Sequence, residues 1–179
     1  MSETPSISPQ ADAAPPWRIL CVDDETNILS ALRRLFRQNG YQISIAGSGA
    51  EGLKVLEAEP FDLVISDMRM PEMDGAQFLE RVFRLYPDTV RILLTGYADI
   101  TSTISAINKG QIYRYVSKPW DDQELLTTVR QALDLKALQR EKLRLEALTA
   151  RQNDELKALN LSLEEKVQAR TQELALANE

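Results

Sequence analysis

Five short apolar segments alternate with amphipathic ones between Trp17 and about Lys118, and this alternation limits the possible folds more than any other feature of the chain. The first four apolar segments are almost continuously apolar, which is typical of strands that are covered on both faces of a parallel sheet. Strands that alternate with helices in this way predict an α/β fold, a doubly wound five-stranded parallel sheet with right-handed crossovers. The predicted strands are residues 19–22, 43–46, 63–66, 92–95 and 113–117.

The segments between these strands carry the apolar spacing of helices. Apolar residues recur three and four positions apart in residues 28–36, 53–56, 78–83 and 100–107, as on the buried face of an amphipathic helix. Each segment is followed by a glycine or proline, which favours the end of a helix. The residues expected to end these four helices are Gly40, Pro60, Pro87 and Gly110.

The last third of the chain is predicted to be one long helix, because no glycine or proline follows Pro119. Asp121 or Asp122 can cap its start. From residue 134 onward nine acids and eight bases surround an apolar seam, whose spacing of 3-4-4-3-4 from residue 156 to residue 174 is close to a heptad repeat with one stutter. We therefore expect a coiled coil over residues 134–179 that joins two chains as a parallel homodimer, with a single solvated helix as the alternative. The seam contains Leu138, Leu145, Leu156, Leu159, Leu163, Val167 and Leu174.

Composition excludes several classes of function. The formal net charge of −6 argues against direct binding of nucleic acid, which needs a concentrated cationic face. The chain has no histidine and one cysteine, Cys21, so catalytic triads with histidine and cysteine metal clusters are excluded. Residues 1–16 are rich in proline and are expected to form a disordered arm. They lack a signal pattern, and no apolar run is long enough to cross a membrane; the predicted location is the cytoplasm.

Acidic and hydroxyl residues follow the predicted strands. Asp23 and Asp24 follow the first strand, Asp67 the third, Thr95 ends the fourth and Lys118 follows the fifth. In a parallel sheet these positions share one edge, where ligands bind. Three carboxylates in one cleft favour a hard dication, and oxygen ligands suit Mg²⁺. A carboxylate can also attack phosphorus to give an aspartyl phosphate, and Asp67, on the central strand of the cleft, is the best candidate.

These segments resemble the receiver domain of two-component response regulators. The matching motifs are VDDE at 22–25, SDMRMPEMDG at 66–75, LLTGYAD at 93–99 and YVSKPW at 115–120, within a predicted domain of residues 17–133. The resemblance implies a flavodoxin-like strand order of 2-1-3-4-5. It also implies phosphorylation of the chain by a sensor histidine kinase or phosphotransfer protein, with the chain acting as a phosphoacceptor rather than as an enzyme on other substrates.

The same resemblance implies a role for each site residue. Asp67 is the phosphoacceptor, and Asp23, Asp24, Asp67 and the backbone carbonyl of Arg69 are the Mg²⁺ ligands. Lys118 contacts the phosphoryl group and precedes a cis bond to Pro119. Thr95 and Tyr115 are the switch pair, of which Thr95 turns toward the phosphoryl group while Tyr115 swings inward.

The output of the chain stays open at this stage. Residues 107–125 and 159–174 resemble receivers and helical linkers that precede cyclic-di-GMP phosphodiesterases of the HD-GYP type or transcriptional regulators, which indicates a missing output domain. The alternative is a stand-alone receiver whose coil docks a partner. A remote alternative is dinucleotide binding, because Gly47, Gly49 and Gly52 form a GxGxxG sequence; Ser48 and Glu51 fit a helix capping box better. A Mg²⁺-dependent phosphohydrolase is disfavoured, since Arg69 stands where such enzymes carry an acid.

Overall fold

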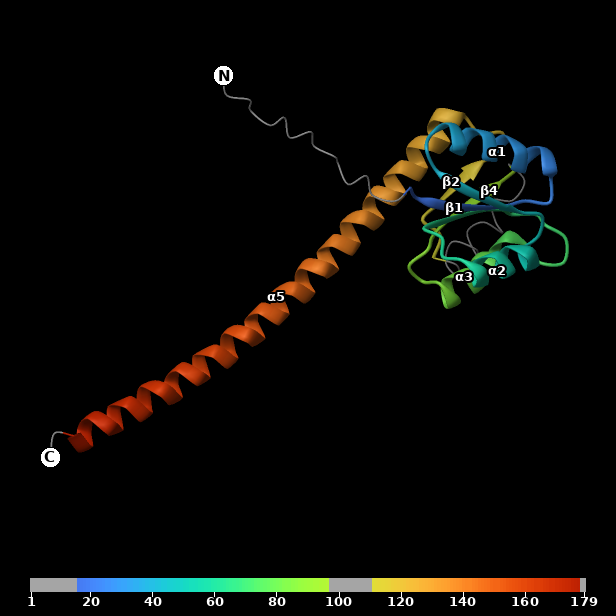
Figure 1. Cartoon of the computed structure of the whole chain (residues 1–179). Coiled ribbons are helices and arrows are strands. Elements are labelled where there is room, and N and C mark those ends of the chain that lie inside the picture. The colour runs from blue at the N-terminus through green and yellow to red at the C-terminus, as the bar shows by residue number, and fades with distance from the viewer. Residues whose placement is uncertain (1–15, 97–110, 178–179) are drawn as a thin grey trace, which may run out of the picture. The chain divides into compact units, whose positions relative to one another are not determined.

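A computed structural model describes residues 16–96 and 111–177 of the chain. Its sheet has five parallel strands in the order β2-β1-β3-β4-β5 (Figure 1). This confirms the predicted α/β class and the strand order that the resemblance implied. The predicted arm, apart from residue 16, and the predicted helix at 100–107 lie outside the described residues. The strands are β1 (Arg18–Val22), β2 (Gln42–Ala46), β3 (Leu63–Asp67), β4 (Val90–Thr95) and β5 (Arg114–Ser117).

Burial separates the central strands from the edge strands. Every residue of β3 is buried, and so are all but the first residues of β1 and β4. The prediction that four strands are covered on both faces is wrong for β2, where only Ala46 is buried and Gln42 is exposed. β2 is the edge strand next to β1, so one of its sides has no neighbouring strand and its side chains are only partly covered.

Helices cover both faces of the sheet (Figure 1). Helix α1 (Thr26–Gln38) and the first turns of α5 (Asp122–Ala177) bury Leu32, Phe36 and Leu125 in one apolar layer. Helices α2 (Gly49–Ala58) and α3 (Gly75–Leu85) bury Leu56 and Phe78 in the other. The strands contribute side chains to the two layers alternately, as the pleat requires.

Local sequence explains where these helices begin and end. α1 ends at Gln38, and Gly40 has a φ of +83°, a left-handed conformation that glycine adopts without steric cost. α5 begins after Asp121, whose Oδ1 accepts hydrogen bonds from the amides of Gln123 and Glu124. Both the glycine stop and the aspartate cap were predicted from the sequence.

The chain divides into two units, Met1–Asp134 and Leu135–Glu179. Helix α5 is continuous through Asp134 and ends at Ala177 (Figure 1). In the second unit the leucines and the valine of the predicted seam are all exposed in the single chain. Within the described ranges, no helix combines the length and the apolarity that a membrane span requires.

Candidate functional site

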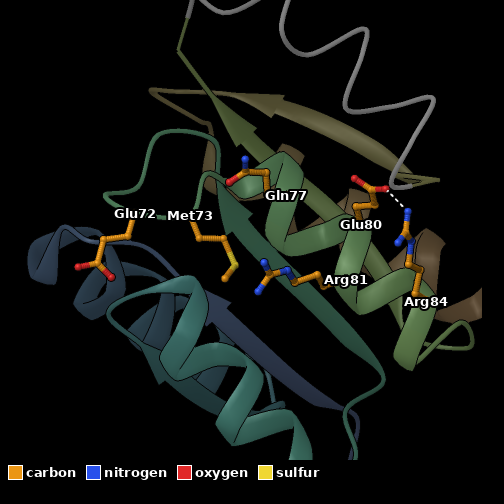
Figure 2. Close-up of a pocket in the computed structure, with 6 residues that line it drawn as sticks. All are labelled: Glu72, Met73, Gln77, Glu80, Arg81 and Arg84. Carbon is orange, nitrogen blue, oxygen red and sulfur yellow. Dashed lines mark hydrogen bonds and ion pairs between the residues drawn. The ribbon is translucent and has the colours of Figure 1, made fainter.

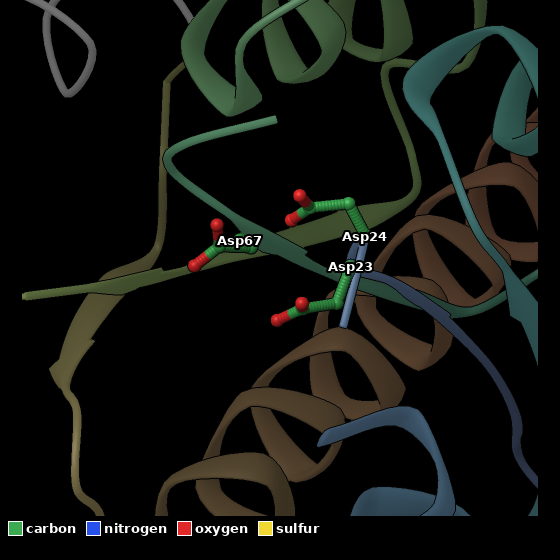
Figure 3. A group of neighbouring side chains, drawn as sticks. All are labelled: Asp23, Asp24 and Asp67. Carbon is green, nitrogen blue, oxygen red and sulfur yellow. The ribbon is translucent and has the colours of Figure 1, made fainter. Parts of the chain in front are cut away.

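Three carboxylates meet at the carboxyl end of the sheet. Asp23 and Asp24 follow β1, and Asp67 is the last residue of β3 (Figure 3). One carboxylate oxygen from each lies within 4.8 Å of the others. Asp23 and Asp67 are buried, whereas Asp24 is exposed. The structure therefore brings together the three acids that the sequence placed at one sheet edge, and leaves one of them open to solvent.

Lys118 joins the two buried carboxylates. Its Nζ lies 2.8 Å from Asp23 Oδ2 and 2.6 Å from Asp67 Oδ1, with Glu25 Oε1 at 4.0 Å. Its backbone amide donates to the Thr95 carbonyl at 2.8 Å, and the bond to Pro119 is cis, as the resemblance implied. One ammonium thus faces three acids, so the cleft keeps a surplus of negative charge.

The pKa values in the cleft reflect burial and the contacts between Lys118 and the carboxylates. Burial raises the pKa of the Asp23 carboxyl, although hydrogen bonds from Lys118 and from the Glu25 amide oppose the shift. Burial by itself would lower the pKa of the Lys118 ammonium, but the hydrogen bonds and Coulomb attraction of Asp23 and Asp67 outweigh it, and the pKa is raised. Lys118 therefore stays charged at neutral pH, while the ionised form of Asp23 is held at a cost.

The backbone after β3 holds Asp67 in place. The Arg69 amide donates to Asp67 Oδ2 at 2.9 Å, and the Gly75 amide donates to the Met68 carbonyl at 2.9 Å. A Cβ at Gly75 would overlap the carbonyl oxygen of Asp67 and would lie 3.0 Å from Met68 Cα. The loop can close over Asp67 because position 75 has no side chain. Sequence reasoning gave Gly75 no role, although the Asp-Gly pair at 74–75 is a turn signal.

Thr95 and Tyr115 occupy neighbouring strands. Thr95 ends β4, is buried, and its hydroxyl donates to the Gly96 carbonyl at 3.3 Å. Tyr115 lies on β5 two residues before Ser117, the partner of Thr95 in the register, so both side chains project from the same side of the sheet. Tyr115 is 51% exposed, whereas Thr95 is buried.

The acidic group fits Mg²⁺ by its chemistry. Its donors are all carboxylate oxygens, the ligands that Mg²⁺ prefers, and one from each acid lies within 4.8 Å of the others. Asp24 is exposed, so this side of the group is open to water or to an incoming oxygen. Asp23, Asp24 and Asp67 could hold the ion once Lys118 gives up part of its contact with the carboxylates.

The glycine-rich sequence at 47–52 serves packing and helix capping. Ser48 Oγ accepts from the Glu51 amide at 3.2 Å, whereas Glu51 Oε2 accepts from the Gly47 amide at 2.6 Å. The capping box expected here is therefore only half formed, because the glutamate binds the residue before the cap. A Cβ at Gly49 would lie 2.9 Å from Met73 Sδ. Since the protein itself uses these amides and this space, the geometry gives dinucleotide binding no support.

A second hollow, of about 360 Å³, lies on α3 (Figure 2). Glu80 and Arg84, which both line it, form an ion pair of 2.6 Å, and none of the three clustered acids lines it. Its mixed charge and exposed walls assign it no chemistry. The lining residues are Glu72, Met73, Gln77, Glu80, Arg81 and Arg84.

Comparison with known proteins agrees with this geometry. Residues 19–130 match the family described as response regulator receiver domain. The chain is 39% identical over 123 residues to the hydrogenase transcriptional regulatory protein HoxA of Bradyrhizobium diazoefficiens, covering 69% of this chain and 25% of that protein. It is 38% identical over 122 residues to the transcriptional regulatory protein GlrR of Escherichia coli, covering 68% and 27%. The chain thus spans about a quarter of the length of these relatives.

A solved structure is similar over the same region. The signal receiver domain of an HD domain-containing protein from Pseudomonas fluorescens is 45% identical, with a TM-score of 0.67, and the match covers 69% of this chain and 98% of that one. The matched region is therefore the α/β unit that carries the acidic cleft.

Proposed function

The chain belongs to the response regulator receiver family, and from this premise we propose that it accepts a phosphoryl group on Asp67 and passes the change on to α5. The observation that carries the proposal is the cleft itself. A buried carboxylate at the end of β3 lies 2.6 Å from Lys118 and within 4.8 Å of two further acids. Lys118 offsets only part of the negative charge of these acids, which leaves the site suited to a divalent cation and to the phosphoryl group that it would neutralise.

The donor is a phosphohistidine of a sensor histidine kinase or of a phosphotransfer protein. An oxygen of Asp67 attacks the phosphorus, an O–P bond forms, and the N–P bond of the donor breaks with its electron pair on the imidazole nitrogen. Lys118 neutralises one phosphoryl oxygen, and the Thr95 hydroxyl turns from the Gly96 carbonyl to donate to another. Transfer of this kind depends on position and charge neutralisation rather than on further covalent chemistry.

Mg²⁺ would be held by Asp23, Asp24, Asp67 and the backbone carbonyl of Arg69. When bound, it supplies positive charge for the phosphoryl oxygens. The chain's own residues orient these ligands. Asp24 is open to solvent, the Glu25 amide donates to one oxygen of Asp23, and the Arg69 amide donates to one oxygen of Asp67.

The signal leaves through β5 and α5. When Thr95 turns toward the phosphoryl group it vacates space beneath β5, and the exposed Tyr115 moves inward to fill it. Residues 17–133 act as the receiver, residues 1–16 as an arm, and residues 134–179 as a coiled coil that joins two chains. Because α5 has no break between Asp122 and Ala177, the receiver and the coil share one continuous helix along which the change is passed on.

The controlled output is a separate module, for which a phosphodiesterase of the HD-GYP type is the first candidate. The similarity to the receiver of an HD domain-containing protein favours it. The alternative is a coil that docks a partner protein, which the exposed apolar residues of the second unit favour.

Intact mass spectrometry tests the phosphoacceptor. The full chain, incubated with Mg²⁺ and acetyl phosphate, should gain the mass of one phosphoryl group, and Asp67→Asn should gain none. Asp88→Asn, a change of an exposed aspartate, is the matched control and should behave as the wild type. Phosphate on Asp67→Asn would show that another residue is the acceptor.

A further inference from the structure

The C-terminal part of α5 repeats its sequence every 11 residues. Residues 145–155, 156–166 and 167–177 read LEALTARQNDE, LKALNLSLEEK and VQARTQELALA. Each copy begins with an apolar residue and has alanine in third place. A small polar residue stands in fifth place: Thr149, Asn160 and Thr171. Because the three copies follow one another directly, the same arrangement of side chains recurs along the surface of the helix every 11 residues.

The repeat places an apolar ridge along one side of the helix. Its first, fourth and eighth places are apolar in seven of nine cases, Gln152 and Arg170 being the exceptions. The five ridge leucines of the first two copies are 48–56% exposed, whereas Leu143, Leu161 and Leu176 off the ridge are 63–75% exposed. Residues three and four apart cover one another on a helix, which explains the lower exposure in these two copies. In the third copy Val167 and Leu174, on either side of Arg170, are 65% and 66% exposed. The ridge contains Leu145, Leu148, Gln152, Leu156, Leu159, Leu163, Val167, Arg170 and Leu174.

A seven-residue repeat does not follow this ridge to its end. Continued from Leu156, Leu159 and Leu163, it would next place Lys166 and Glu173 in the seam. The 11-residue repeat instead reaches Val167 and Leu174. Eleven residues make three turns of about 3.67 residues each, and a seam with that period winds to the right.

We propose that this ridge is the contact surface of a parallel, in-register homodimer with a right-handed supercoil. The inference rests on the proposed dimeric coil and defines its register and hand. We infer that the partner helix is a second copy of the chain. To contact the ridge along its whole length, a partner helix must repeat its own apolar residues every 11 positions, and an identical helix in register does so.

The Gln152 layer supports parallel pairing. In register, Gln152 meets Gln152 of the second copy, and an amide can both donate and accept; a buried polar pair of this kind fixes register. The same register places Arg170 against Arg170, a like-charge layer that weakens pairing, and Glu173, three residues away on the same helix, is spaced to offset that charge. Antiparallel pairing centred on the ridge would place Gln152 against Val167 and leave the amide without a partner, which is costly.

Light scattering of the unphosphorylated full chain tests the surface. The wild type should have the mass of a dimer, and Leu159→Glu, which places a charge in the ridge, should be monomeric at the same concentration. Leu161→Glu makes the same change two residues on, off the ridge, and should stay dimeric. A monomeric wild type, or equal behaviour of the two variants, would overturn the proposal.

Single cysteines test register and direction. After mild oxidation, Leu174→Cys should form a disulfide-linked dimer at least tenfold faster than Glu173→Cys, and Leu148→Cys should also link to itself. Faster linking at 173 would refute the 11-residue register, and no self-linking at 148 and 174 would refute parallel pairing. Cys21 is fully buried and does not interfere. The gain of a phosphoryl group on Asp67 is measured separately, so either proposal can fail while the other stands.

Discussion

Replacement of Lys118 by methionine tests whether this ammonium stabilises the folded state by offsetting the charge of the buried carboxylates. Its Nζ lies 2.8 and 2.6 Å from two buried carboxylates. At an effective dielectric constant of about 20, opposite charges 2.8 Å apart attract by about 6 kcal/mol, and the desolvation of all three groups offsets much of the sum. Removing one partner of a buried pair leaves the other charge uncompensated, which costs about 3–5 kcal/mol.

Urea unfolding, followed by circular dichroism in buffer with a metal chelator, measures this cost. With a slope near 2 kcal/mol per molar urea, the midpoint of Lys118→Met should fall by about 2 M at pH 7. Lys54→Met, which changes an exposed lysine on α2, should stay within about 0.5 kcal/mol of the wild type. Equal midpoints for the two variants would refute the role of Lys118.

The pH dependence of the same experiment follows from the direction of the pKa shifts. The pKa of Asp23 is raised in the fold, so its contribution favours folding below its ordinary pKa and is lost as the pH rises through the raised value. The pKa of Lys118 is raised as well, so its contribution is complete at neutral pH and is lost only in alkaline solution. In Lys118→Met, a proton bound to a buried carboxylate can replace the positive charge of the missing ammonium. The difference in free energy of unfolding between this variant and the wild type should therefore become smaller as the pH is lowered from 7 to 5. A difference that widens as the pH falls would contradict this account.

Two further substitutions test the loop and the cap. Gly75→Ala must push the Asp67 carbonyl away, so we expect the free energy of unfolding to fall by about 2–3 kcal/mol and the gain of phosphate mass to be slower. A variant with wild-type stability and a wild-type rate of phosphorylation would show that the loop can move without cost. Ser48→Ala removes the hydroxyl that accepts from the Glu51 amide and should lower the free energy of unfolding by about 1 kcal/mol, with no effect on phosphate uptake; an unchanged urea midpoint would mean that Glu51 caps α2 unaided.

Local sequence determined the elements of this fold and the edge at which the site lies. The apolar runs that became β1, β3 and β4 are short and almost continuous, whereas the helical segments repeat apolar residues three and four positions apart. Both patterns are set by residues close together in the chain. The end of α1 near Gly40 and the cap of α5 at Asp121 also depend only on residues that are close together in the chain. Because parallel strands end at one edge, the positions of Asp23, Asp67 and Lys118 after their strands were enough to predict that they meet.

Tertiary structure decided everything that depends on which segments become neighbours. β2 has the apolar run of a fully covered strand but is only partly buried, because at the sheet edge it has one neighbouring strand. The contacts of Lys118 with two carboxylates join residues 95 and 51 positions apart in the chain, and the need for glycine at position 75 arises only where the loop turns back over the Asp67 carbonyl. The sequence pattern determines which face of a helix or strand is apolar. The free energy of packing between distant segments determines which other element that face contacts.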